Sequence, residues 1–387
     1  MLQYIWQGSD WPSFTWDAEQ LLAPLGECRL SQGRLIARVA GLSLSLGLQA
    51  QAEILVEETI KTAAIEGEQL DPRSVRSSVA RRLGIPTAGL PVDRRIDDLV
   101  SVLLDATQNC EMPLSAERLW GWQAALFPSG YSGMHKIQVG KWREGSEPMR
   151  VVSGPIGREK VHYEAPPSGQ VAAEMERFLS WWQESRGNVE GIIRAALAHF
   201  WFVTIHPFDD GNGRLARALT DMALSQDDQQ RVRAYSLSAQ IMAEREEYYD
   251  ILERCQKGTC NITQWLVWFL GCFSRAIRRS EDILDGVFSR SEFWRRYDHL
   301  QLTDRQKKVI NRLLEEGPGG FEGGLTTKKY ASMTHTSKGT AFRELDQLYE
   351  WGVLERIGKG RSVRYELANS VDRHRTLTLY RHQDDPP

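Results

Sequence analysis

The chain has 387 residues, of which 41% are hydrophobic and 26% are charged, and its formal net charge is −3. This composition is typical of a soluble globular protein of two or three domains, and the near-neutral charge excludes a strong overall attraction to nucleic acid or to an anionic membrane. The most apolar run, residues 265–273, is too short to span a bilayer, so no membrane partner is expected. Five cysteines without Cys-x-x-Cys spacing argue against a disulfide framework and predict a reducing, cytoplasmic compartment.

The first hundred residues, 1–100, predict a helical domain. Aromatic side chains crowd its beginning, and we expect them to pin this segment onto a neighbouring core. A surface that stacks nucleic-acid bases would need interleaved Lys and Arg, which the opening lacks. The stretch 21–58 is rich in Leu and Ala with helical spacing, and it predicts two long helices.

A short segment at the end of this domain, residues 58–68, carries a glutamate on a helix face. Thr62 and Glu66 are spaced i and i+4, so they share one face of a helix that Gly67 could end. Taken alone, this pattern describes an ordinary amphipathic helix end with a solvated glutamate.

The middle of the chain, residues 101–290, predicts a helical core. We expect helices at 97–107, 116–127, 171–183 and 189–204. The last of these is apolar nearly all round, which indicates a buried central helix. A β-branched run at 149–153, followed by Gly154 and Pro155, predicts a hairpin, with a plain structural loop as the alternative.

The stretch 205–217 follows the central helix and combines features that suit a phosphate ligand. Gly211 and Gly213 flank Asn212, and such a turn can aim consecutive N–H groups at an anion where a helix begins. Arg214 and Arg217 lie on one face of the first turn of that helix and could bind further phosphate oxygens. The alternative is a glycine-rich connector with incidental charges.

Two further residues of this stretch suit the same ligand. Asp210 is a hard oxygen ligand for Mg²⁺ held jointly with phosphates, and His206 can take a proton near neutral pH. His199, two turns earlier, is either a second catalytic histidine or a hydrogen-bonded core histidine. Together the stretch predicts a polyphosphate site with a metal ligand and a base.

These residues resemble the pattern of the Fic family, His-x-Phe-x-(Asp/Glu)-Gly-Asn-Gly-Arg-x-x-Arg, at every defined position. Fic proteins are α-helical enzymes, most of which transfer AMP from ATP to a hydroxyl side chain of a target protein. The resemblance implies a mainly α fold with a small β-hairpin flap, ATP as substrate and Mg²⁺ as cofactor. It implies that His206 is catalytic, that Asp210 binds the metal, and that the nucleotide contacts Gly211, Asn212, Gly213, Arg214 and Arg217.

The resemblance also assigns roles to two segments outside the motif. One class of Fic proteins carries (Ser/Thr)-x-x-x-Glu-(Gly/Asn) before the core, which residues 62–67 match. In that class the glutamate, here Glu66, pairs with the second arginine of the motif, here Arg217, and holds the nucleotide in an unproductive pose. The family's hairpin upstream of the motif docks the target by strand addition, which implies a flap at Glu147–Ile156 that includes Val151 and Val152.

A tyrosine pair follows the motif helix. Fic proteins often have such a pair lining the adenine pocket, which implies this role for Tyr248 and Tyr249. An amide follows about seven residues later in the family, and this chain has Gln256 there in place of the expected asparagine. That departure leaves strict adenine specificity open.

The C-terminal region, residues 295–370, predicts three helices followed by two short strands, and 371–387 predicts a frayed tail. This order resembles a winged helix-turn-helix, which implies DNA contact through the third helix and the Lys359–Arg361 tip. However, the third helix carries Glu344, Asp346 and Glu350, which would repel phosphates. Residues 301–370 therefore leave DNA contact and protein binding or self-association both open.

The sequence thus predicts a protein adenylyltransferase that modifies a Ser, Thr or Tyr hydroxyl of a target protein and is autoinhibited by Glu66. Self-modification stays open, as does transfer of another phosphate-containing group or removal of AMP. An alternative from a different class is a nucleotide-sensing DNA-binding transcription regulator.

Overall fold

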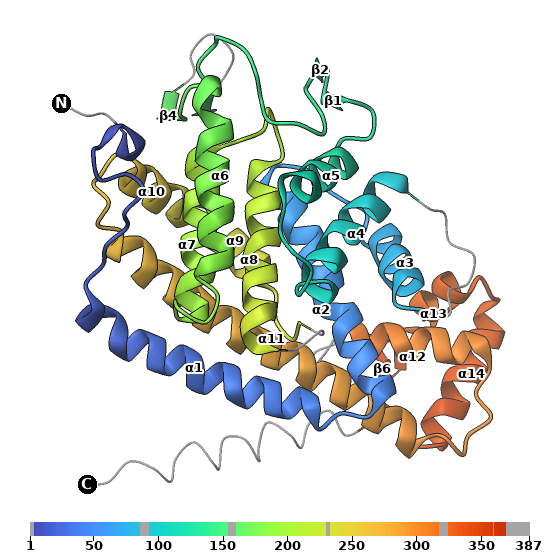
Figure 1. The fold of residues 1–387 in the computed structure, drawn as a ribbon. Helices are drawn as coiled ribbons and strands as arrows, with labels where there is room; N and C mark the ends of the chain where they lie inside the picture. The colour runs from blue at the N-terminus through green and yellow to red at the C-terminus, as the bar shows by residue number, and fades with distance from the viewer. Residues whose placement is uncertain are drawn as a thin grey trace, which may run out of the picture. The chain divides into compact units, whose positions relative to one another are not determined.

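Fourteen α-helices and three small antiparallel sheets make up the part of the chain that the computed structural model describes, which is residues 4–85, 93–153, 160–229, 233–316, 324–358 and 360–368 (Figure 1). The predicted mainly α class is therefore confirmed. The chain divides into two compact units, Met1–Leu284 and Asp285–Pro387. Residues 1–100 and most of 101–290 fall in the first unit, and the boundary predicted between them stays a prediction. Among the described helices, none combines the length and apolar character needed to cross a membrane.

The first unit begins with a 3-10 turn and four helices. They are η1 (Ile5–Gln7), α1 (Ala18–Ala40), α2 (Leu44–Ile65), α3 (Pro72–Arg82) and α4 (Arg94–Gln108). The two long predicted helices are α1 and α2, whereas α3 was not predicted. Helix α1 begins where the Asp17 carboxylate accepts the Glu19 and Gln20 N–H groups. Helix α2 ends at Ile65, and Gly67 beyond it has a φ of +82°, a left-handed conformation that favours glycine.

The aromatic opening packs onto the central helices, as the sequence predicts. The Trp11 ring lies 6.3 Å from the Trp201 ring, and Phe14 lies 5.8 Å from Phe200. Trp11 Nε1 also donates a 2.9 Å hydrogen bond to the Glu174 carboxylate. These contacts fix the beginning of the chain on the helix that leads to His206.

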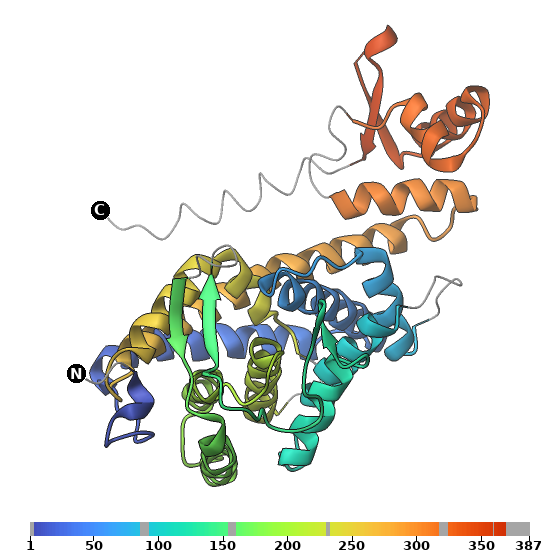
Figure 2. The same cartoon turned by 90° about the horizontal axis from the view of Figure 1, so that it is seen from above.

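The core of the first unit consists of α5 (Ala116–Leu126), α6 (Ser168–Glu184), α7 (Gly191–Ile205), α8 (Asn212–Asp228), α9 (Leu237–Ala243), α10 (Arg245–Gln256) and the first part of α11 (Thr263–Arg296). Helix α7 is buried along almost its whole length, as its apolar sequence predicts. It packs along α8, and the two helices lie side by side in both views (Figures 1 and 2). The loop that joins them, residues 206–211, carries His206, Asp210 and Gly211 of the predicted site.

Two hairpins lie in the described part of the first unit. Strand β1 (Tyr131–Ser132) pairs with β2 (His135–Lys136), and β3 (Arg150–Ser153) pairs with β4 (Lys160–Glu164). The second hairpin is the pair of green arrows in Figure 2, and its register shifts between Val151 and Val152. Strand β3 lies within the predicted flap, whose residues 154–156 fall outside the described residues.

The second unit has the predicted order of three helices and a hairpin. These elements are α12 (Asp304–Glu316), α13 (Thr327–Thr334), α14 (Lys338–Glu350), β5 (Leu354–Ile357), η2 (Gly360–Ser362) and β6 (Arg364–Leu367). The strands β5 and β6 are antiparallel, and Leu325 forms an isolated bridge with Tyr365. A separate core that includes Val309, Leu345 and Leu348 holds this unit together. Lys359, the Arg361 side chain and the predicted tail lie outside the described residues.

Candidate functional site

His206 directly follows the last residue of helix α7, where the chain leaves the helix. Its φ of 54° is left-handed, which is strained for a residue other than glycine, and its N–H still donates to Phe202 O at 3.0 Å. The ring nitrogen Nδ1 is 3.2 Å from Val203 O. Because a carbonyl can only accept, Nδ1 carries the proton and Nε2 keeps a free lone pair. Burial lowers the pKa of His206 to about 4, so the ring is neutral at pH 7 and Nε2 is ready to accept a proton.

Arg143 holds the loop at His206 through its backbone. Its Nε donates to His206 O at 2.7 Å, its N–H donates to Pro207 O at 2.9 Å, and Nη2 bonds Pro166 O. The side chain is 3% exposed, and a cation at the end of α7 is favourably placed for the helix dipole. The Arg143 charge also contributes, after burial, to lowering the pKa of His206. Sequence reasoning missed this residue because nothing local links it to a motif 63 residues away.

The side chain of Asn212 closes the loop between α7 and α8. Its Oδ1 accepts from the Phe208 N–H at 3.0 Å, and its Nδ2 donates to Phe208 O at 2.8 Å. Gly211, just before it, has a φ of +89°, and a Cβ there would lie 2.9 Å from the Phe127 ring. Helix α8 therefore begins at Asn212, with first-turn N–H groups that have no partner inside the helix, as the predicted anion nest requires.

Two consecutive carboxylates of the loop are held by the segment around β1 and β2. Asp210 accepts from the Ser132 hydroxyl and, at 2.5 Å, from the Gly211 N–H, whereas Asp209 accepts from the Gln138 N–H at 2.8 Å. Among the described residues, no group of three or more His, Cys, Asp or Glu could hold a metal alone. A single carboxylate at Asp210 fits Mg²⁺, which is often bound by one or two carboxylates with phosphate oxygens and water. Sequence reasoning missed Ser132.

The two arginines of α8 carry buried nitrogen atoms that lack a hydrogen-bond acceptor among the described residues. The Arg214 guanidinium lies 4.8 Å over the Phe127 ring and 3.7 Å from a Glu68 oxygen, and its Nε has no partner. Arg217 is 1% exposed, and its Nη1 has no partner. Buried N–H groups are nearly always satisfied, so these two atoms suit the oxygens of a bound anion.

The remaining nitrogens of Arg217 bind helix α2. Nε donates to Thr62 Oγ1 at 2.7 Å, and Nη2 donates to Thr62 O at 3.0 Å and to Glu66 Oε1 at 2.7 Å. Burial lowers the pKa of Arg217, but the charge and the hydrogen bond of Glu66, together with Tyr248 and Tyr249, outweigh this effect and the net shift is upward. A Cβ on Gly213 would lie 2.3 Å from Glu66 Oε1, so this oxygen rests against the first turn of α8. Glu66 and Arg217, 151 residues apart, form the pair that the family resemblance implied.

The two tyrosines of α10 differ in their exposure and in their partners. Tyr248 is 2% exposed and its hydroxyl bonds His199 Nε2 at 2.8 Å, whereas the half-buried Tyr249 has the Arg245 guanidinium 4.9 Å over its ring. Gln256 is also buried, and its Nε2 donates to Thr204 Oγ1 at 3.3 Å. Tyr249 is thus the more exposed of the two tyrosines, and the nucleotide roles of Tyr248, Tyr249 and Gln256 all stay predictions.

His199 has the environment of a core histidine. Besides Tyr248, it contacts Thr220 Oγ1 through Nδ1 at 2.9 Å, and its side chain is fully buried. Burial lowers its pKa to about 3. Both ring nitrogens are occupied, which leaves none for proton transfer.

Only one of the two valines of the predicted flap is exposed to solvent. Val152 is 47% exposed, whereas Val151 is half-buried and packs with Tyr163. Among the described residues, β3 pairs with β4 alone. A target-docking role for both valines stays a prediction.

Comparison with protein families gives two matches. Residues 113–224 match the model of the Fic/DOC family, and residues 4–85 match DUF4172, a domain of unknown function. The first match contains the motif loop, Asp210 and both arginines, and the second contains Thr62 and Glu66.

Comparison with individual proteins gives more distant matches. The Protein adenylyltransferase Fic of Drosophila ananassae is 31% identical over 215 residues, which are 54% of this chain and 39% of the fly protein. The protein of that name from Drosophila grimshawi is 34% identical over 94 residues, or 24% of this chain and 18% of its own length, so the chain matches less than half of these relatives. A solved Fic family protein from Desulfovibrio desulfuricans G20 has a TM-score of 0.51 at 20% identity, covering 90% of this chain and 96% of that one. This last likeness shows the fold alone.

Proposed function

Because the chain belongs to the Fic/DOC family and has an N-terminal DUF4172 domain, we propose that it is a protein adenylyltransferase that transfers AMP from ATP to a Ser, Thr or Tyr hydroxyl of a target protein. The fly relatives that match this chain carry the name protein adenylyltransferase. The observation that carries the proposal is a neutral His206 whose Nε2 can accept a proton. It lies beside the helix that holds two buried guanidinium nitrogens, and these lack acceptors among the residues that the structure describes. That combination suits a phosphate chain beside a proton acceptor.

In the proposed reaction, His206 Nε2 takes the proton of the target hydroxyl as its oxygen attacks the α-phosphorus. The new bond joins that oxygen to phosphorus, the bond to the β-phosphate oxygen breaks, and pyrophosphate leaves with the bonding electrons. Arg214 Nε and Arg217 Nη1 would bind phosphate oxygens, and the first-turn N–H groups of α8 would stabilise the charge that develops. Asp210 would hold Mg²⁺, which neutralises phosphate charge when bound.

We further propose that Glu66 inhibits this reaction. Its carboxylate oxygen occupies Arg217 Nη2 at 2.7 Å and lies against the first turn of α8. A negative charge there repels the γ-phosphate and withdraws the arginine from it. ATP could still bind, but its α-phosphorus would not face the attacking hydroxyl.

Two matched substitutions test the inhibitory role. Glu66→Gln keeps the size of the side chain and removes its charge, and we expect it to raise transfer of AMP to protein. Glu68→Gln removes an equal charge from a residue whose carboxylate lies 3.7 Å from Arg214, whereas Arg217 pairs with Glu66. Equal activation by both variants would contradict the specific role of Glu66.

The role of His206 is tested in protein activated by Glu66→Gly. Adding His206→Ala should abolish transfer while calorimetry still detects ATP binding, because the imidazole acts on the hydroxyl proton. The exposed His299 provides a matched control, and His299→Ala should leave both quantities unchanged. Loss of ATP binding together with transfer would indicate a structural role for His206. We also propose, from composition, that the protein works in the cytoplasm.

A further inference from the structure

Helix α2 carries a series of polar residues on one face. They are Glu58, Thr62 and Glu66, and a spacing of four residues keeps side chains on the same face of a helix. Thr62 and Glu66 both bind Arg217 of α8. Glu58 lies about 12 Å from Glu66 along the helix axis, at 1.5 Å per residue. The face that holds the proposed inhibitory glutamate therefore has a second carboxylate about two turns earlier.

Glu58 is buried against the start of helix α9. It is 5% exposed, and its carboxylate accepts from the Ser236 hydroxyl at 2.7 Å, from the Ser238 N–H at 3.2 Å and from the Ser238 hydroxyl. Ser236 directly precedes α9, and its oxygen also accepts the Ala239 N–H at 3.1 Å. Burial of a carboxylate is costly unless donors surround it. These bonds therefore favour the arrangement in which the start of α9 lies against α2.

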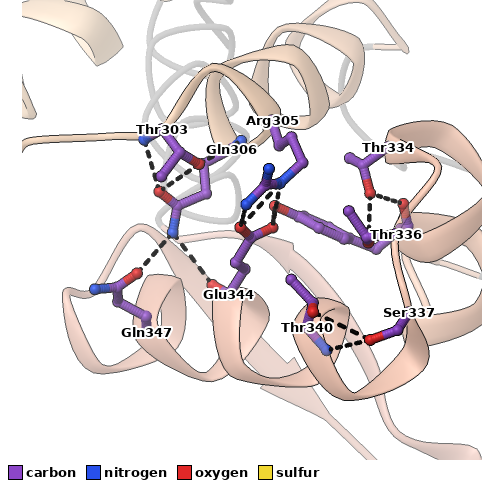
Figure 3. A network of polar contacts seen from close by, with 10 residues as sticks. Thr303, Arg305, Gln306, Thr334, Thr336, Ser337, Thr340, Glu344 and Gln347 are labelled. Carbon is purple, nitrogen blue, oxygen red and sulfur yellow. Dashed lines mark hydrogen bonds and ion pairs between the residues drawn. The ribbon is translucent and has the colours of Figure 1, made fainter.

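The donors to Glu58 are short groups that cannot follow it far. Among the described residues, its hydrogen bonds come from one backbone N–H and two serine hydroxyls. Glu344 of the second unit is also buried, but it bonds the long side chain of Arg305 (Figure 3). A serine hydroxyl moves about a single side-chain bond, whereas an arginine has several. The contact of Glu58 therefore tolerates little movement of α2 relative to α9.

A second buried carboxylate lies near Glu58 on helix α8. Asp221 is one turn beyond Arg217, is 3% exposed and pairs with Arg233. Glu58, Asp221 and Arg233 line one small cavity of about 20 Å³. Two carboxylates at a buried interface repel each other, and this repulsion is strong where water is excluded. The contact between α2 and α8 therefore depends here on Arg233 for one carboxylate and on the serines for the other.

We propose that Glu58 is a positioning residue for the inhibitory glutamate, which it keeps against Arg217 by holding α2 on the start of α9. The proposal rests on the proposed inhibitory role of Glu66. Without the contact of Glu58, the C-terminal end of α2 can leave α8. Arg217 Nη2 then becomes available to a phosphate oxygen, and the negative charge of Glu66 leaves the first turn of α8.

The proposal is tested by measuring transfer of labelled AMP to protein in two backgrounds. In the wild-type background, Glu58→Ala should raise transfer about tenfold or more, because a hydrogen bond to a buried charge shifts a local opening equilibrium by at least about that factor. In the Glu66→Gly background, the same substitution should change transfer by less than about twofold, because the contact that it loosens is already absent. A purely structural role would instead lower transfer in both backgrounds.

Two further variants separate the contact of Glu58 from general loss of stability. Ser238→Ala removes one donor to Glu58 and leaves α2 unchanged, and it should raise transfer by a smaller factor. Val56→Ala is the matched control on α2. Val56 is buried and packs with Val75 and Val79 of α3, and it lies two residues from Glu58, on another side of the helix. Its truncation should lower the melting temperature and leave transfer as low as in wild type.

Amide hydrogen exchange without nucleotide measures the position of the helix independently of activity. Exchange at residues 62–66 should be faster in Glu58→Ala than in wild type. Wild-type exchange there, wild-type transfer by both Glu58→Ala and Ser238→Ala, or equal activation by Val56→Ala would each overturn the role of Glu58. Failure of Glu66→Gly to raise transfer would instead refute the inhibition itself, which is a distinct outcome.

Discussion

Replacing Arg143 by methionine removes the donors that hold the loop at His206 and keeps an apolar side chain of similar length. Three carbonyl groups lose their hydrogen bonds to the guanidinium, those of His206, Pro166 and Ile205. The longest of these bonds is the one to Ile205 O, at 3.4 Å. Each buried carbonyl without a partner costs about 1–3 kcal/mol, and with partial relaxation the loss is about 3–5 kcal/mol. At about 2–4 °C per kcal/mol for a domain of this size, the melting temperature should fall by roughly 6–20 °C.

The same substitution should change the chemistry of His206. Because the Arg143 charge contributes to lowering the pKa of His206, its removal should move that pKa upward from about 4. In the proposed reaction, kcat should fall because the base is displaced. The KM for ATP should change little, because the arginines of α8 remain in place. NMR titration of the His206 ring and thermal unfolding measure the two effects separately.

Arg118→Met is the matched control. Arg118 is also largely buried and bonds several carbonyls, including Met112 O and Asn109 O. Its substitution should lower the melting temperature and leave the His206 pKa unchanged. A melting temperature for Arg143→Met within about 2 °C of wild type, with an unchanged His206 pKa, would refute the assignment of Arg143 as the residue that positions His206.

Three further predictions concern single side chains. The His206 ring should titrate near pH 4, below its ordinary pKa of 6.5. The free energy of unfolding should therefore fall as the pH drops from 6.5 to 4, because the unfolded chain binds the proton first. An NMR midpoint near 6.5 would contradict this. Asn212→Ala should cost about 2–4 kcal/mol in denaturant unfolding, because it leaves both backbone groups of Phe208 unpaired, and an unchanged midpoint would mean that the loop closes without them. Glu344→Ala should lower the melting temperature of the second unit, because Arg305 and the Tyr330 hydroxyl lose their shared acceptor, and an unaltered calorimetric trace would show that the network is dispensable.

The sequence predicts best what depends on neighbours in the chain. The helix start at Asn212 and the end of α2 near Gly67 follow from local glycine and capping chemistry. The Glu66–Arg217 contact joins residues 151 positions apart, and only the family resemblance pointed to it.

Arg143 and the acids of α14 show what the sequence conceals. No residue pattern links Arg143 to His206, because backbone carbonyls carry no sequence signal. A charge count treats Glu344 as exposed, although folding buries it against Arg305 and Tyr330. The identities of residues predict chemistry, whereas their accessibility and their long-range partners depend on the packing of the whole unit.

The proposed activity is tested most directly with ATP labelled separately on the α- and γ-phosphates. Wild type, Glu66→Gly and Glu66→Gly/His206→Ala are each incubated with Mg²⁺ and each label, and protein-bound label is measured on the chain itself and on added proteins. AMP transfer with inhibition by Glu66 predicts α-label on protein with the Glu66→Gly variant, little with wild type and none with the double variant. Protein-bound γ-label, or no label from either position although ATP binds, would contradict it.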